Sequence, residues 1–80
     1  MSQSPIIVPD LGFGEEPVRV GEWLVSPGDK VVAGDRLVEL LCASVLFYAE
    51  AEDGGRFVLA GVRSGETVVA GAKIGVLEVD

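Results

Sequence analysis

A segment that occurs twice is the feature that most constrains how this chain folds. Residues 25–34 (VSPGDKVVAG) and 62–71 (VRSGETVVAG) are identical at six of ten positions, at an offset of 62 − 25 = 37 residues. Leu37 and Ile74 extend the match at the same offset. Six identities in the same order are more than common turn chemistry alone produces. The chain is therefore interpreted as two similar halves.

The length of the chain limits how these halves fold. With 80 residues there is room for one small domain, expected over residues 1–80. The half-repeats span about residues 8–44 and 45–80. Neither half is long enough to bury an apolar face alone, so we expect the two halves to pack on each other.

The pattern of the apolar runs predicts an all-β protein. Eleven Gly and four Pro interrupt short Val-rich runs, and no 3.6-residue periodicity is sustained. Residues 26–29 (SPGD) place Pro and Gly where a type II turn requires them. Residues 53–56 (DGGR) predict a tight hairpin, because Gly-Gly tolerates the positive φ of the primed turns. Two similar β-halves suggest two small sheets related by a pseudo-twofold axis.

Composition and charge exclude several classes of function. Thirteen Asp and Glu against six Lys and Arg give a net charge of −7, which disfavours nucleic acid and anionic membrane surfaces as partners. The chain has no His and a single Cys, Cys42, so we expect no metal site. The first residues lack the basic region of a signal peptide, and no run approaches the ~20 apolar residues of a membrane span. We expect a cytoplasmic protein.

The most unusual segment is the uncharged run at residues 40–49 (LLCASVLFYA). A strand with one face in water alternates apolar and polar residues, and this run does not. It therefore predicts a strand pair that needs cover on both faces.

The ordered motifs together resemble a known family. Residues 8–12 (VPDLG), 23–31 (WLVSPGDKV), 37–39 (LVE) and 62–68 (VRSGETV) are similar to lipoyl domains of the acyltransferase components of 2-oxo acid dehydrogenase complexes. More broadly they resemble the biotinyl/lipoyl attachment family, and the resemblance covers nearly the whole chain. It implies a flattened barrel, the barrel-sandwich hybrid, of two four-stranded antiparallel sheets.

The resemblance also implies where the family's cofactor would be attached. Relatives present one lysine on the hairpin between the two halves, usually within Asp-Lys-Ala, and lipoate or biotin acylates its ε-amine. Aligned without gaps, that tripeptide falls on residues 43–45, so Ser44 occupies the lysine position and Ala43 that of the acid. Lys30 and Lys73 lie away from this hairpin. We therefore expect no bound lipoate or biotin.

Catalysis finds little support among the candidate side chains. Ser44 and Cys42 have no His to activate them as nucleophiles. The carboxylate pairs Glu15-Glu16 and Glu50/Glu52 fit a solvated rim better than acid–base chemistry or a cation site. We expect that the protein is not an enzyme.

The resulting hypothesis is a lipoyl-like domain that works as a protein-interaction or structural module. The partner would be a second copy or a larger protein, bound through the apolar hairpin tip. The residues expected to form this contact are Leu41, Cys42, Ala43, Ser44, Val45 and Leu46. Two alternatives remain open: a carrier domain of a multienzyme complex modified at another site, and an inert module of a larger chain.

Overall fold

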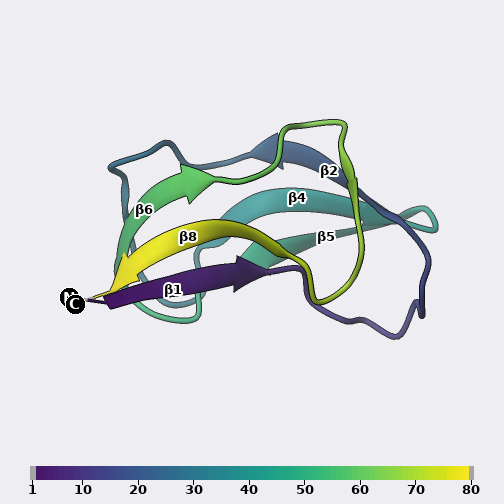
Figure 1. Cartoon of the computed structure of the whole chain (residues 1–80), viewed down its shortest axis with the longest axis horizontal. Helices are drawn as coiled ribbons and strands as arrows, with labels where there is room; N and C mark the ends of the chain where they lie inside the picture. Colours follow the sequence, from purple (N-terminus) through teal and green to yellow (C-terminus); the bar gives the residue numbers. More distant parts are fainter. Residues whose placement is uncertain (1, 80) are drawn as a thin grey trace.

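The computed structural model describes residues 2–79 as eight β-strands joined by turns and loops (Figure 1). The molecule measures 35 × 20 × 17 Å along its principal axes. No helix that is long and apolar enough to cross a membrane occurs among these residues. The strands are β1 (Ser2–Ile7), β2 (Val18–Trp23), β3 (Lys30–Val31), β4 (Arg36–Cys42), β5 (Val45–Glu50), β6 (Gly55–Ala60), β7 (Thr67–Val68) and β8 (Lys73–Val79).

The strands form two four-stranded antiparallel sheets, which confirms the predicted fold. One sheet has the order β1-β8-β6-β3 and the other has the order β5-β4-β2-β7. Figure 1 shows β1, β8 and β6 in front of β4 and β5. Replacing each strand by its counterpart in the other half (β1 by β5, β8 by β4, β6 by β2, β3 by β7) converts one strand order into the other. The sheets are thus related by a pseudo-twofold operation.

The strand boundaries repeat at the offset seen in the sequence. β6, β7 and β8 each begin and end 37 residues after β2, β3 and β4. β5 follows β1 by 43 residues, because the connection at residues 8–17 is six residues longer than its counterpart at residues 51–54. The longer connection is the main departure from symmetry, and it packs beside the β4–β5 hairpin.

The two copies of the repeated turn share one set of hydrogen bonds. The Asp29 N–H donates to the Ser26 carbonyl at 2.9 Å, and Gly28 between them has φ 96°, which confirms the predicted type II turn. The Asp29 carboxylate also accepts from the Ser26 N–H at 2.8 Å. In the second half, Glu66 makes the same two bonds with Arg63. The acidic residue at this position therefore serves the turn.

The hairpin predicted at residues 53–56 is wrong. β5 and β6 belong to different sheets, so residues 51–54 cross from one sheet to the other. Neither Gly54 nor Gly55 has a positive φ. Gly55 instead lies within β6, opposite Val31 and Val79, where the strands leave no room for a side chain. Gly55 therefore marks a close approach of backbones, whereas Gly54 does not.

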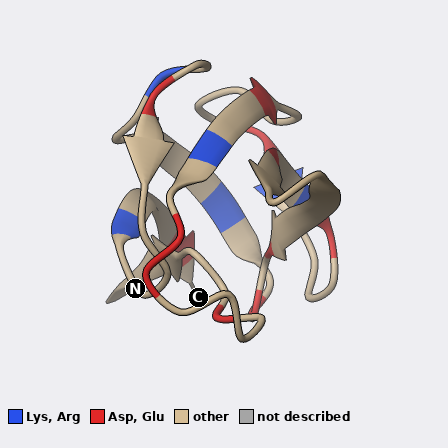
Figure 2. Ribbon diagram, turned by 90° about the vertical axis from the view of Figure 1, so that its right-hand side faces the viewer, with Lys and Arg blue, Asp and Glu red and all other residues tan. Residues whose placement is uncertain are grey.

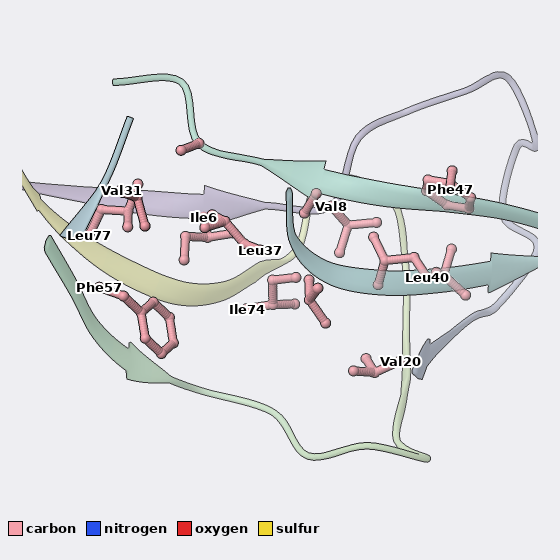
Figure 3. Close-up of a cluster of buried hydrophobic side chains, with 14 of the residues drawn as sticks. Ile6, Val8, Val20, Val31, Leu37, Leu40, Phe47, Phe57, Ile74 and Leu77 are labelled. Atoms are coloured by element: carbon pink, nitrogen blue, oxygen red, sulfur yellow. The ribbon is translucent and has the colours of Figure 1, made fainter. Parts of the chain in front are cut away.

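The core lies between the sheets and is built from both halves (Figure 3). Leu37 and Ile74, which match at the repeat offset, are both fully buried. Trp23 covers one end of the core, with its ring 5.3 Å from that of Phe57 and its indole N–H donating to the Val62 carbonyl at 3.0 Å. Because both halves contribute side chains to this core, neither half could bury its apolar residues alone.

Candidate functional site

The β4–β5 hairpin projects at the end of the molecule opposite the two termini (Figure 1). Cys42 and Val45 form its last strand pair, so the turn contains only Ala43 and Ser44. Their φ angles are 49° and 66°, as in a type I′ turn, which normally prefers Asn-Gly. The left-handed conformation costs a residue with a side chain about 1–2 kcal/mol. The flanking strand ladder therefore holds an unfavourable turn in place.

The apolar run of this hairpin is covered on one face only. Leu40, Cys42 and Phe47 point into the core, and Phe13 from the long connection packs on Phe47 with ring centroids 6.1 Å apart. The other face is not covered by residues 2–79. Leu41 and Leu46 lie opposite each other there and are 42% and 55% exposed. Val45 pairs with Cys42 on the other face, yet it is 44% exposed beside the turn.

Cys42 does not belong with the other five residues expected at the contact surface. Its side chain is buried, with 2% of its surface exposed, whereas Leu41, Ala43, Ser44, Val45 and Leu46 are exposed. Strand alternation is the reason, because Cys42 shares the inward face with Leu40. Burial, reinforced by the negative charge of Glu16, raises the pKa of the Cys42 thiol above its ordinary value of 9.0.

Alkylation of Cys42 should be slow in the folded protein. A raised thiol pKa lowers the fraction of reactive thiolate at neutral pH, and burial restricts access to it. The rate should rise as the pH passes through the raised pKa. Because the fold favours the neutral thiol, its contribution to stability is present below the unfolded-state pKa and is lost as the pH rises through the folded-state pKa.

Iodoacetamide kinetics between pH 7 and 10, compared with the chain in denaturant, measure this protection. Equal rates for the folded and unfolded chains at pH 7 would show that the thiol is open to solvent.

The carboxylates considered from the sequence are not gathered into a site. β5 ends at Glu50, so Glu52 does not continue its strand face. Both line an open groove of about 450 Å³, whose other walls include Asp10 and Tyr48. Glu15 and Glu16 lie exposed on the long connection. Among residues 2–79, no three Asp, Glu or Cys side chains are placed together to hold a metal ion.

One contact beside the hairpin was not predicted from the sequence. The guanidinium of Arg36 lies over the ring of Tyr48, 4.3 Å from the centroid. The two residues are twelve apart, and only the antiparallel pairing of β4 with β5 brings them together. The contact holds the Tyr48 ring toward β4.

The lysines lie elsewhere in the fold. Lys30 is in β3 and Lys73 begins β8, so both belong to the sheet that does not contain the hairpin. Both are exposed. Figure 2 shows the basic residues as separate bands along the ribbon, with acidic segments between them.

Comparison with known proteins assigns the family. The sequence model of the biotin/lipoyl family, described as "Biotin-requiring enzyme", matches residues 4–77. The chain belongs to the biotin/lipoyl attachment family. Strands β2–β7 of this biotin/lipoyl domain lie within the matched residues, together with most of β1 and β8.

A solved structure supports the same fold. The biotin/lipoyl domain is similar to the lipoyl domain of the 2-oxoglutarate dehydrogenase complex from Azotobacter vinelandii, with a TM-score of 0.73 and 24% sequence identity. The similarity covers 92% of this chain and 94% of that one. No curated protein matches the sequence. The structural likeness therefore establishes the lipoyl-domain architecture around the hairpin.

Proposed function

We propose that this biotin/lipoyl domain lacks the attachment lysine and acts through protein–protein contact, without catalysis. The observation that carries the proposal is the composition of the β4–β5 turn. The turn consists of Ala43 and Ser44, at the hairpin where the relatives that the sequence resembles present their acylated lysine. The gap-free alignment assigns the lysine position to Ser44, a residue of that turn.

The side chains at the turn do not fit an amide-linked lipoyl or biotinyl group. Such a group needs a primary amine, and Ala43 and Ser44 supply a methyl and a hydroxyl. The amines of Lys30 and Lys73 are attached to the other sheet. A ligase that recognises the hairpin would therefore find no amine at its tip.

The exposed apolar side chains at the tip support a contact function. Leu41, Val45 and Leu46 are each about half exposed. Covering that remaining half would contribute about 2–5 kcal/mol in total. Association of two proteins costs about 4–15 kcal/mol in lost freedom of motion. A stable complex therefore needs further contacts beyond the tip itself.

Intact-mass spectrometry tests whether the protein carries an attached lipoyl or biotinyl group. We expect the protein to keep its unmodified mass after co-expression with lipoate–protein ligase and, separately, with biotin ligase. A lipoyl domain with an Asp-Lys-Ala tip, expressed in the same cells, is the positive control. An adduct on Lys30 or Lys73 would instead establish a carrier modified at another site, and the proposal would be wrong.

A further inference from the structure

The two sheets have four edge strands, and three of them are protected against pairing with another strand. β3 and β7 contain two residues each, too few to act as a template. β1 begins with polar residues and contains Pro5. Short length and proline are devices that proteins use to prevent edge-to-edge association.

The fourth edge, β5, has neither the short length nor the proline that protects the others. Its six residues (VLFYAE) include no Pro or Lys, and the only charge is Glu50 at its end. Among residues 2–79, no strand pairs with its outer edge. Over Val45–Ala49 its pairing with β4 is regular, and the register shifts only at Glu50. An apolar edge of this length is a template for an added strand.

The hairpin geometry identifies the backbone groups that face this edge. A two-residue turn closes on a hydrogen-bonded pair, here Cys42 and Val45. Every second residue of β5 therefore bonds to β4, and this alternation continues to Ala51, whose N–H donates to the Asp35 carbonyl at 2.8 Å. The N–H and C=O groups of Leu46 and Tyr48 consequently point outward.

The internal symmetry of the fold provides a check on this assignment. β1 is the counterpart of β5, and Pro5 corresponds to Tyr48 at the offset of 43 residues. Their cross-strand partners, Val76 and Glu39, correspond at the offset of 37 residues. Proline has no N–H and is accepted only where that group faces outward. The equivalent group of Tyr48 therefore faces the open edge, and β5 lacks the proline that blocks its counterpart.

A groove runs beside the same edge. It holds about 450 Å³ and is lined by Tyr48 and Glu50 on one side and by residues 7–10 on the other. Its carboxylates, which include Asp10 and Glu50, disfavour an acidic occupant. Residues 40–49 of the hairpin carry no charge. An extended segment without acidic side chains is thus compatible with this groove and edge.

We propose that the occupant is a second copy of this chain, paired antiparallel through β5 about a twofold axis. The inference deepens the contact part of the proposed function and rests on it. Leu46 of each copy lies opposite Tyr48 of the other, so that the two residues exchange backbone hydrogen bonds. Two four-stranded sheets then become one continuous eight-stranded sheet across the axis.

Self-pairing in this register suits the charges and the side chains. Antiparallel pairing places the two Glu50 carboxylates at opposite ends of the interface, whereas parallel pairing would set them side by side. On the outer face, Tyr48 of one copy joins Leu41 and Leu46 of the other in one apolar patch. The uncharged tip of each copy then reaches the groove of the other. Since each copy carries a net charge of −7, added salt should strengthen the dimer.

Sedimentation velocity from micromolar to millimolar concentration tests the dimer. Wild type should shift from monomer to dimer, and Tyr48→Pro should weaken association at least about tenfold, because it removes the N–H at the centre of the pairing. Leu46→Glu should do the same, because it adds a carboxylate to an interface between two copies that are already acidic. Gln3→Glu is the matched control, since Gln3 occupies the position of Leu46 on β1, and it should dimerise like wild type.

Disulfide trapping tests the register. Opposed, hydrogen-bonded residues have Cα atoms about 5.5 Å apart, within reach of a disulfide. A mixture of Leu46→Cys and Tyr48→Cys proteins should cross-link faster than either variant alone. Faster formation of Tyr48→Cys homodimers would place Tyr48 on the axis and overturn this register.

Two further outcomes separate this inference from the proposed function. A wild type that stays monomeric at millimolar concentration overturns self-pairing. An unmodified mass in the ligase experiment would still support the proposal that the domain lacks the attachment lysine. If that monomer captures a foreign strand along β5, with protection of the Leu46 and Tyr48 amides from exchange, the edge is a docking site for another protein and the second copy is the wrong occupant.

Discussion

Gly55→Ala is expected to remove a large part of the stability of this domain. A Cβ atom at residue 55 would lie 2.0 Å from the carbonyl oxygen of Glu78 and 3.1 Å from the Cα of Val79. Both atoms belong to the backbone of β8, which is held between β6 and β1 and cannot move without disturbing both. We expect a loss of about 3 kcal/mol or more. Domains of this size have a total stability of about 4–12 kcal/mol.

The neighbouring glycine supplies the control. A Cβ atom at Gly54 would make only ordinary contacts, with the Val31 carbonyl oxygen at 3.6 Å and the Val32 Cα at 3.9 Å, and the residue has no positive φ. Gly54→Ala should therefore change the free energy of unfolding by no more than about 0.5 kcal/mol. Urea unfolding followed by the fluorescence of Trp23 measures both variants. Equal midpoints for the two would contradict the close approach of β6 to β8.

The sequence predicts the parts of this fold that depend on local chemistry or on repetition. The repeat at residues 25–34 and 62–71 leads to two equivalent sheets because the same run of turn and strand residues must fold the same way twice. The type II turn follows from Pro27 and Gly28, which have few other conformations available. The family resemblance then places a hairpin at residues 43–45, and the turn is found at Ala43 and Ser44.

The errors have a common physical cause, which is long-range strand pairing. Gly54-Gly55 has the local signature of a hairpin, but the reason for Gly55 is a backbone from β8, more than twenty residues away. The uncharged run around Cys42 gave no indication which side chains face inward, because apolar residues occupy successive positions and do not alternate with polar ones. The open edge of β5 and the stacking of Arg36 on Tyr48 depend on which strands become neighbours, and the composition of one strand does not determine this.

Ser44→Lys is expected to convert the domain from an unmodified protein into a ligase substrate. The turn residue at 44 is exposed, lies at the tip of the hairpin and already has the left-handed backbone, so a lysine there adds no new strain relative to serine. Its ε-amine would extend away from both sheets into solvent. Co-expression with lipoate–protein ligase or biotin ligase, followed by intact mass and peptide mapping, should show an adduct on residue 44 and none on Lys30 or Lys73.

A lysine at a second exposed turn separates position from mere exposure. Ser64 lies in the repeated turn at residues 63–66 and is also exposed, so Ser64→Lys should remain unmodified. Equal acylation of both variants would mean that the ligase accepts any exposed lysine and does not select residue 44.

If Ser44→Lys stays unmodified, the variant that carries Asp-Lys-Ala at residues 43–45 provides the next test. Acylation of that variant would show that the hairpin keeps the attachment geometry and has lost only the side chains, whereas its failure would mean that the assignment of residue 44 is wrong.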